Sequence, residues 1–150
     1  GPSKVRVLLG HDGAIVCEGI DLSPAPEGPL QVSLAAAPID AADVFLYHKT
    51  TRREVYERAR ASRPDRDSVL LWNRQEEITE AAEANVVVLL DGARITPPVE
   101  CGLLPGTFRA ELLETGAITE RRITVGDLGR ASAVWLINSV RGWMEATILP

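Results

Sequence analysis

The chain has 150 residues, of which 45% are hydrophobic and 25% are charged, and its formal net charge is -5. These values indicate one domain that is long enough to bury a core, with the composition of a soluble globular protein. The acidic balance argues against a general nucleic-acid surface, which needs a basic stripe, and no apolar run approaches the roughly 18 residues of a membrane span.

The first part of the chain predicts a β-hairpin followed by a linker. Two apolar runs in residues 4–22, KVRVLLGHDGAIVCEGIDL, are separated by an Asp-Gly pair, which is a good hairpin signal. Residues 23–29, SPAPEGP, contain three prolines and favour a linker over a strand or a helix. The next run, LQVSLAAAPI at 30–39, is typical of a buried strand, and DVFLYHK at 43–49 predicts a second strand.

A charged segment with helical spacing follows these strands. It extends from Thr50 to about Ser62, and its apolar residues Val55 and Ala59 lie one turn apart. Thr50 or Thr51 is suited to the N-cap position, because a threonine hydroxyl can accept a hydrogen bond from a free backbone N–H of the first turn. We therefore expect a helix directly after Lys49.

The middle of the chain combines strands with one more helix. SVLLWN at 68–73 predicts a strand, and NVVVLLDGARITPP at 85–98 predicts a second Asp-Gly hairpin that ends at a Pro-Pro pair. The sequence LLPGTFRAELLETG predicts a helix that begins at Gly106 or Thr107 and ends at Gly116.

The last part of the chain predicts three more strands, at 117–125, 133–139 and 141–149, with a single helical turn at 126–131. The whole pattern indicates a strand-rich, mixed α/β domain that carries two helices. Because hairpins recur, we expect the sheet to be mostly antiparallel.

Four polar features are candidates for chemistry, and each also has an ordinary structural explanation. Lys49 lies at a junction between a predicted strand and a helix, although most lysines are simply solvated. The start of the predicted second helix offers free backbone N–H groups that can bind a phosphate, although most helix starts bind nothing. The other candidates are an acid and an amide around a short irregular segment, and a polar group at the end of a strand: Glu80, Asn85, Asn138, Ser139 and Arg141.

Taken together, these features suit one kind of ligand. Pyridoxal phosphate needs a lysine amine for its aldehyde, a carboxylate for its ring nitrogen, and N–H or hydroxyl donors for its phosphate. The burial of a lysine beside a cationic ring would lower the pKa of its amine, and the opposite charge of the ring would keep a nearby acid ionised.

Four motifs in order carry a family resemblance over about residues 30–143. HKTTRR, ITEAAEANVVV, ITPPVECGLLPGTFRAELL and LINSVRG resemble the class IV aminotransferases, the fold-type IV (D-amino acid aminotransferase-like) enzymes that use pyridoxal phosphate. The segments FLYHKTTRR and NSVRGW are most similar to those of aminodeoxychorismate lyase-like domains. Such domains are often fused behind component I of aminodeoxychorismate synthase. The resemblance implies a strand-rich large domain with that cofactor.

The resemblance also implies roles for individual residues. Lys49 would bond the cofactor aldehyde and move the α-proton of the substrate, while Glu80 would hold the ring nitrogen. Asn85 would support the Glu80 segment and the edge of the cofactor, and Arg141 is a candidate for binding a substrate carboxylate.

The phosphate of the cofactor would be held by the backbone N–H groups of Thr107 and Phe108 together with the hydroxyl of Ser139. The family's phosphate-binding arginine in the smaller domain has no matching position in this chain. Tyr56 is a candidate for the tyrosine that contacts the phenolic oxygen of the cofactor in some relatives, but its helical spacing favours a place in the core.

The resemblance further implies a division of the chain into parts. Residues 1–22 would be the remainder of a small N-terminal domain, residues 23–29 the linker, and residues 30–150 the large cofactor-binding domain. We therefore expect the chain to be the C-terminal part of a longer polypeptide.

The function expected from this resemblance is a lyase that acts on 4-amino-4-deoxychorismate and releases pyruvate and 4-aminobenzoate for folate synthesis. The alternatives are a class IV aminotransferase of branched-chain or D-amino acids, and a non-catalytic domain that keeps the fold without the cofactor. The expected partners are a small-molecule substrate and a second copy of the chain in a homodimer, with no nucleic acid and no membrane. Cys17 and Cys101 have neither metal-ligand spacing nor the density of a disulfide scaffold, so we expect a cytoplasmic protein without a metal site.

Overall fold

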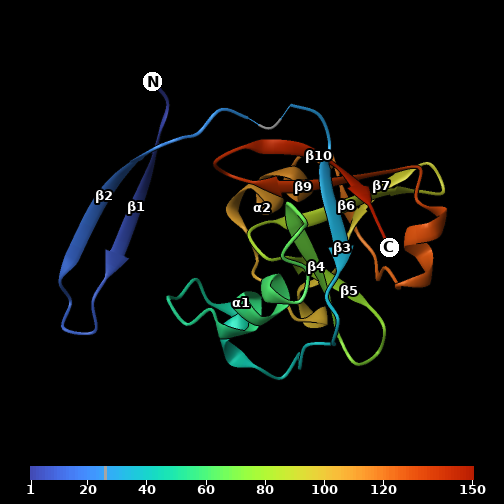
Figure 1. Ribbon diagram of the computed structural model, residues 1–150, viewed down its shortest axis with the longest axis horizontal. Helices are drawn as coiled ribbons and strands as arrows, with labels where there is room; N and C mark the ends of the chain where they lie inside the picture. Colours follow the sequence, from blue (N-terminus) through green and yellow to red (C-terminus); the bar gives the residue numbers. More distant parts are fainter. Residues whose placement is uncertain (26) are drawn as a thin grey trace.

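The computed structural model describes residues 1–25 and 27–150, so that Pro26, inside the expected linker, lies outside the described residues. Two separate sheets are present (Figure 1): a hairpin of two strands at the N-terminus and a sheet of eight strands that forms the body of the molecule. Neither helix of the described chain has the length and apolarity that a bilayer-spanning helix requires.

The eight-stranded sheet begins at Leu30 and contains the rest of the chain's strands. Its spatial order is β5-β4-β3-β10-β9-β6-β7-β8. The strands are β3 (Leu30–Leu34), β4 (Ser68–Trp72), β5 (Ile78–Ala81), β6 (Asn85–Leu90), β7 (Ala93–Thr96), β8 (Thr119–Glu120), β9 (Ala133–Asn138) and β10 (Gly142–Ile148). The helices are α1 (Glu54–Ala61) and α2 (Thr107–Glu114), and three short 3-10 helices are η1 (Val44–Tyr47), η2 (Val99–Cys101) and η3 (Gly126–Arg130).

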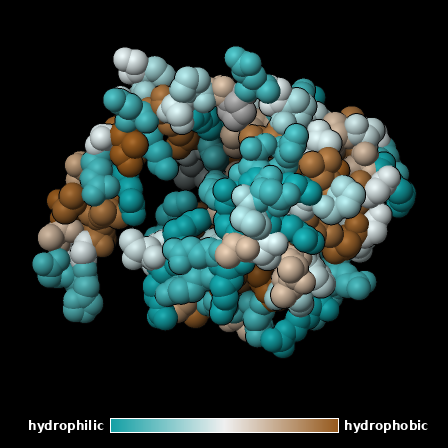
Figure 2. Space-filling view, in the orientation of Figure 1, coloured by the Kyte–Doolittle hydropathy of each residue, from teal (hydrophilic) through white to brown (hydrophobic). Residues whose placement is uncertain are grey.

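The N-terminal hairpin, β1 (Ser3–Leu9) and β2 (Ile15–Asp21), confirms the prediction from the first Asp-Gly pair. Its register places Val7 opposite Cys17 and Leu9 opposite Ile15, so one face of the hairpin is apolar. Leu9 is 74% exposed and Val7 is 62% exposed. Figure 2 shows that hydrophobic side chains gather on the hairpin.

The sheet of the body is mixed but mostly antiparallel, as expected, because four of its seven neighbouring pairs are antiparallel. β3 is parallel to both β4 and β10, and β7 is parallel to β8, whereas the other neighbouring pairs are antiparallel. The parallel pairing of β3 with β4 follows from the position of α1, which lies in the chain between these two strands. A crossover through a helix returns the chain in the same direction, while the two-residue Asp-Gly turn between β6 and β7 reverses it.

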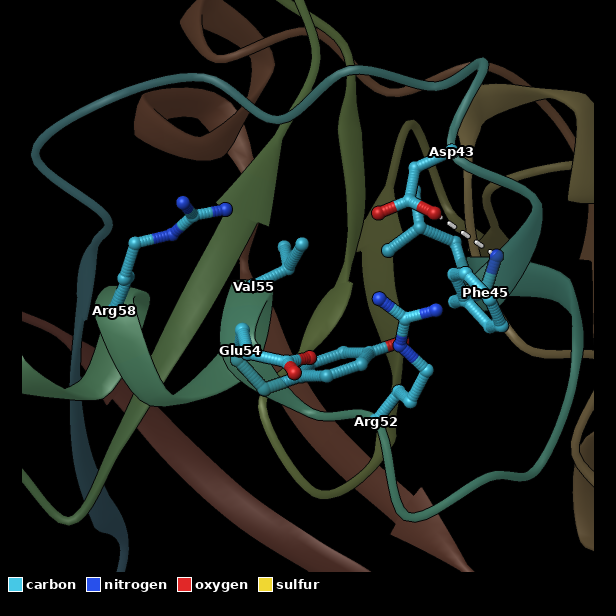
Figure 3. Close-up of a pocket in the computed structure, with 8 residues that line it drawn as sticks. Asp43, Phe45, Arg52, Glu54, Val55 and Arg58 are labelled. Carbon is cyan, nitrogen blue, oxygen red and sulfur yellow. Dashed lines mark hydrogen bonds between the residues drawn. The ribbon is translucent and has the colours of Figure 1, made fainter.

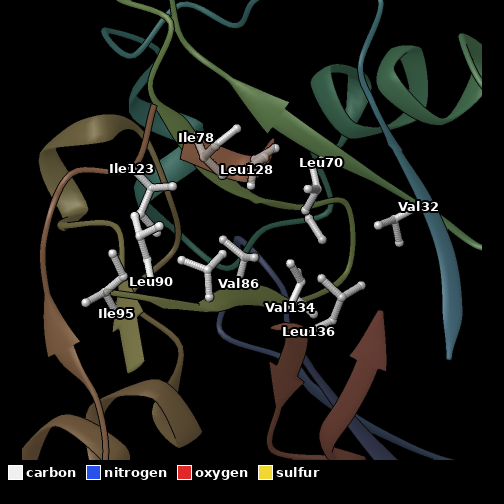
Figure 4. Close-up of a cluster of buried hydrophobic side chains, with 13 residues drawn as sticks. Val32, Leu70, Ile78, Val86, Leu90, Ile95, Ile123, Leu128, Val134 and Leu136 are labelled. Carbon is white, nitrogen blue, oxygen red and sulfur yellow. The ribbon is translucent and has the colours of Figure 1, made fainter. Parts of the chain in front are cut away.

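The strands divide their side chains between an interior cluster and the two helices. Leu70 on β4, Val86 on β6 and Leu136 on β9 point into the interior cluster (Figure 4). The alternate residue Val69 packs in the cluster under α1, and Val87 packs in the cluster that includes residues of α2. Successive side chains of a strand point to opposite faces of the sheet. The residues of β4 and β6 that point away from the interior cluster therefore pack against α1 and α2, respectively.

The two edges of the sheet approach each other after β8. The predicted strand at 117–125 is wrong over most of its length, because only Thr119 and Glu120 pair with β7. The chain then returns to β5, where the backbone N–H of Ile78 donates to the carbonyl of Ile123 at 2.7 Å. Residues 119–122 are polar and exposed, whereas Ile123 is fully buried. Because Ile123 is buried, the chain leaves the edge strand β7 and turns toward β5.

Two further predictions around Lys49 are wrong. Residues 43–49 do not form a strand, because the Asp43 carboxylate accepts from the backbone N–H of Phe45 at 3.0 Å and starts the 3-10 helix η1. The following helix α1 begins at Glu54 with Arg53 at its N-cap, and not at Thr50 or Thr51. Lys49 thus lies in the loop between η1 and α1.

Candidate active site

A cavity of about 280 Å³ opens between α1, the β5–β6 connection, the start of α2 and the β9–β10 turn. Six predicted cofactor residues lie in its wall: Lys49, Glu80, Asn85, Thr107, Phe108 and Ser139. Arg141 is not one of the lining residues. Its guanidinium Nη2 donates to the backbone carbonyl of Ser23 at 2.8 Å, which places it beside the segment that precedes β3.

A tight connection between β5 and β6 brings the acid and the amide together. Ala81 and Ala84 exchange backbone hydrogen bonds, with the Ala81 N–H donating to the Ala84 carbonyl at 2.8 Å. Glu80 at the end of β5 and Asn85 at the start of β6 consequently face the same cavity. The amide Nδ2 of Asn85 donates to the Leu104 carbonyl at 2.8 Å, which ties this connection to the segment before α2.

Glu80 is 4% exposed, and its burial raises the pKa of the carboxyl from an ordinary 4.5 to about 7. The hydroxyl of Tyr56 donates to Oε1 at 2.7 Å and the backbone N–H of Leu104 donates to the same atom at 3.2 Å, and both contacts favour the ionised form. The positive charges of Lys49 and Arg53 act in the same direction. This site therefore holds an acid that a cationic ligand would return to the ionised state.

Lys49 lines the cavity, and the pKa of its ammonium group is lowered. It is solvent-accessible at the cavity, and the partial loss of hydration lowers the pKa of its ammonium group. The charge of Arg53 lowers this pKa further, while Glu80 acts in the opposite direction. A lowered pKa increases the fraction of neutral amine, which is the form that attacks a carbonyl carbon.

The start of α2 supplies unpaired donors to the same cavity. Gly106 occupies the N-cap position without a side-chain cap, so the first N–H groups of the helix, including those of Thr107 and Phe108, have no partner within the helix. A Cβ placed on Gly106 would lie 2.3 Å from Oδ1 of Asn85. The absence of a side chain at this position is therefore what allows α2 to start against Asn85.

Gly106→Ala is expected to displace Asn85 or the first turn of α2. The overlap cannot be relieved without moving a buried amide, so we expect a loss of about 1–3 kcal/mol in the free energy of unfolding. Urea denaturation followed by circular dichroism measures this loss as a shift of the midpoint. Gly129→Ala is the matched control, because its added Cβ would meet nothing within 4 Å. Equal effects of the two substitutions would contradict the steric explanation.

The raised pKa of Glu80 predicts a defined pH dependence of stability. The folded state binds the Glu80 proton more tightly than the unfolded state, so this contribution is complete below about pH 4.5 and is lost as pH rises to about 7. Glu80→Gln should therefore flatten the change in urea midpoint across this window. The exposed Glu57 on α1 provides the control, since Glu57→Gln should leave the slope unchanged. An unchanged slope in Glu80→Gln would show that other groups set it.

Two functional candidates on α1 were not identified from the sequence as partners of the acid. Tyr56 is 8% exposed and therefore belongs to the core, as its helical spacing favours, but its hydroxyl also bonds Glu80. Arg53 also lines the cavity; its guanidinium carbon lies 4.6 Å from the Tyr56 ring centroid, and its Nη2 donates to the Ala82 carbonyl at 2.6 Å. The available signal was the separation of three residues between them, which places both on one face of a helix.

A second cavity, of about 290 Å³, adjoins the other part of α1 (Figure 3). Tyr56 lines this cavity as well as the first one. Its charged walls carry both signs, and the Arg52 guanidinium covers the Phe45 ring at 4.2 Å. The lining residues besides Tyr56 are Asp43, Phe45, Leu46, Arg52, Glu54, Val55 and Arg58. Tyr56 therefore separates two hollows of the surface.

The strand-rich mixed sheet and the amine, acid and helix start around one cavity define a fold-type IV domain. The pattern of the class IV aminotransferases matches residues 10–149. The chain belongs to the class IV aminotransferase family, whose enzymes use pyridoxal phosphate.

The proteins that resemble the chain are assigned either as aminodeoxychorismate lyases or as aminotransferases. A Schizosaccharomyces pombe protein assigned as an aminodeoxychorismate lyase is 31% identical over 147 residues, covering 93% of this chain and 64% of the relative. The aminodeoxychorismate lyase of Saccharomyces cerevisiae is 30% identical, covering 78% of this chain and 36% of the relative. A crystal structure assigned as an amino-acid aminotransferase of Mesorhizobium loti is 34% identical with a TM-score of 0.91, covering 98% of this chain and 73% of that chain. The chain thus spans under two thirds of the length of both yeast relatives.

Proposed function

We propose that this chain is the cofactor-binding part of a pyridoxal-phosphate-dependent lyase that acts on 4-amino-4-deoxychorismate and releases pyruvate and 4-aminobenzoate. The observation that carries this proposal is the convergence of Lys49, Glu80 and the start of α2 on one cavity. The aminodeoxychorismate lyases among the relatives favour this substrate. The division at residues 23–29, with residues 1–22 belonging to a small domain, is part of the same proposal.

The residues present fit the cofactor. Glu80 is a buried acid whose ionised form needs a cationic partner, and a protonated pyridine ring is such a partner. The N–H groups of Thr107 and Phe108, which have no partner within the helix, suit a phosphate, and the helix dipole adds a favourable contribution. Ser139 lines the same cavity with a hydroxyl donor, and Gly106 leaves space for close approach. When bound, pyridoxal phosphate supplies an aldehyde carbon that bonds an amine and a ring that accepts an electron pair.

In the proposed reaction, Lys49 has two roles. Its Nζ would hold the cofactor by a covalent bond, and as a free neutral amine it would accept the proton from the carbon that carries the substrate's amino group. The lowered pKa of Lys49 favours this neutral form. Nζ later returns a proton as pyruvate leaves. Glu80 would hold the ring nitrogen of the cofactor in its protonated form, and Asn85, which donates to the Leu104 carbonyl, would support the segment that carries Glu80.

Arg141 remains a proposal for the ligand of a substrate carboxylate. Its contact with Ser23 ties it to the segment before β3, so it would have to exchange this carbonyl for a carboxylate in order to act. The pairing of two chains in a homodimer and a cytoplasmic location are likewise proposed from the family.

A second candidate function is amino-group transfer, which the Mesorhizobium loti structure favours by its assignment as an amino-acid aminotransferase. This reaction uses the same lysine, acid and phosphate cradle, so the cavity supports both. The two reactions differ in their products. Pyruvate released from aminodeoxychorismate supports the lyase, whereas amino transfer from a branched-chain or D-amino acid to a keto acid supports the aminotransferase.

Covalent trapping tests the cofactor assignment directly. The chain contains only two lysines, Lys4 and Lys49. Treatment of the protein with pyridoxal phosphate and then sodium borohydride should add the reduced cofactor to the peptide that carries Lys49, as detected by mass spectrometry. Modification of Lys4 alone, or of neither lysine, would rule out the proposed site and favour the non-catalytic alternative.

A further inference from the structure

The two oxygens of the Glu80 carboxylate are bonded unequally. Oε1 accepts from the Tyr56 hydroxyl at 2.7 Å and from the Leu104 N–H at 3.2 Å. Among the described residues, Oε2 receives one long contact, from Nδ2 of Asn85 at 3.4 Å. A carboxylate oxygen offers about two acceptor positions, so Oε1 is filled while Oε2 keeps capacity for a stronger donor.

The hydroxyl that fills Oε1 is held firmly in place. Tyr56 is buried on α1, and the Arg53 guanidinium lies over its ring at 4.6 Å. Arg53 also donates to the carbonyl of Ala82, two residues after Glu80. Two contacts therefore join α1 and its N-cap to β5 and the residue after it, one through the Tyr56 hydroxyl and one through the Arg53 guanidinium.

We propose that Tyr56 is a positioning residue for the cofactor: by occupying Oε1 of Glu80, its hydroxyl leaves Oε2 to accept the N–H of the pyridine ring and keeps that proton on the ring nitrogen. This inference rests on the proposed function, because it needs a protonated ring in the cavity. Tyr56 lines both cavities. The proposal gives it a role beyond packing, because its hydroxyl sets how strongly Glu80 competes for the proton of the ring nitrogen.

The protonation states of the groups around Glu80 support this role. Burial and the neighbouring Glu80 raise the pKa of the Tyr56 hydroxyl, so Tyr56 remains a donor at all working pH values. The charged groups that face Glu80 are Lys49 and Arg53, and both favour its ionised form together with the Tyr56 hydroxyl. Without that hydroxyl the Glu80 carboxylate is a stronger base, and the shared proton moves from the ring nitrogen toward the acid.

Tyr56→Phe tests the proposal with two measurements besides activity. In the cofactor-free protein, the titration midpoint of Glu80, followed by carbon-13 NMR of labelled glutamate side chains and assigned with Glu80→Gln, should rise by about one to two pH units, as expected for the loss of a hydrogen bond to a charged group. In the loaded protein, the nitrogen-15 signal of labelled pyridoxal phosphate should move toward that of the unprotonated ring.

Tyr47→Phe is the matched control. The Tyr47 hydroxyl also makes a hydrogen bond, donating to the Ala41 carbonyl at 2.6 Å, but Tyr47 does not line the candidate cavity. Its removal should leave both the Glu80 midpoint and the ring-nitrogen signal at their wild-type values.

The titration midpoint of Glu80 can also be shifted downward, by a stronger hydrogen-bond donor at residue 56. It contains only two tyrosines, Tyr47 and Tyr56, so Tyr47→Phe makes Tyr56 the sole tyrosine. Incorporation of 3-fluorotyrosine into this variant creates a more acidic phenol at residue 56 and hence a stronger donor. The titration midpoint of Glu80 should then fall. This measurement tests the role of the Tyr56 hydroxyl even if Tyr56→Phe does not fold.

The possible outcomes separate this inference from the proposed function. If the wild-type protein bonds the cofactor at Lys49 but Tyr56→Phe leaves the ring-nitrogen signal unchanged, the positioning role is overturned and the function stands. A changed Glu80 midpoint with an unchanged ring nitrogen also overturns it, since the hydroxyl then has a structural role alone. If the wild-type protein does not bond the cofactor at Lys49, the proposed function is contradicted, and so is the inference, which depends on it.

Discussion

Lys49→Arg is expected to abolish covalent attachment of pyridoxal phosphate and to lower the rate of pyruvate release by at least about 10³-fold. A guanidinium keeps its proton at any working pH, so it can neither attack an aldehyde carbon nor accept a proton from the substrate. The substitution preserves the positive charge beside Glu80, which keeps the electrostatics of the cavity close to the wild type. The measurements are the visible absorbance of the bound cofactor and a coupled assay for pyruvate.

The other lysine of the chain provides the control for this experiment. Lys4→Arg changes an exposed residue of the hairpin strand β1 and leaves Lys49 as the sole lysine. We expect this variant to retain the cofactor band and the activity. Persistence of the band in Lys49→Arg, with loss in Lys4→Arg, would transfer the assignment to the hairpin and refute the site.

Leu70→Ala is expected to lower the free energy of unfolding by about 2–5 kcal/mol. Leu70 is fully buried on β4, where it points into the interior cluster between the central strands (Figure 4). The surrounding side chains belong to several strands of the sheet, so the cavity left by the substitution cannot collapse freely. Urea denaturation followed by circular dichroism measures the effect as a shift of the midpoint at constant slope.

The matched control for this substitution is Leu9→Ala. Leu9 lies on the hairpin and is 74% exposed, so the same change removes few packing contacts. Its effect should remain within about 0.5 kcal/mol. A loss as large as that of Leu70→Ala would mean that the hairpin is packed against the body in solution.

Much of the candidate site follows from residue types at recognisable places in the chain. The lysine after an apolar run, the acid and amide around a short segment, and the glycine before a helix each suggested one part of a cofactor site. The structure brings Lys49, Glu80, Asn85, Thr107, Phe108 and Ser139 to one cavity. It does not bring Arg141 there, because the position of a long side chain after a turn depends on its partner, here the Ser23 carbonyl.

The role of Tyr56 shows why part of the site could not be read along the chain. Helical spacing predicted a buried aromatic residue, and Tyr56 is buried. Its hydroxyl, however, meets an acid 24 residues further along the chain, and local spacing says nothing about such a contact. The same holds for Arg53, whose partner Ala82 belongs to a different element of the fold.

The sequence by itself determined the elements that depend on local interactions: both Asp-Gly hairpins, the helix from Thr107 to Glu114, and the strands with strong apolar runs. Turn geometry, capping and the period of side chains operate over a few residues, so a single sequence contains them. Only the tertiary structure decided which neighbouring strands of the sheet run parallel and how short β8 is. These features depend on which distant strand a segment meets and on which of its residues the core accepts, and that choice is made by burial in three dimensions.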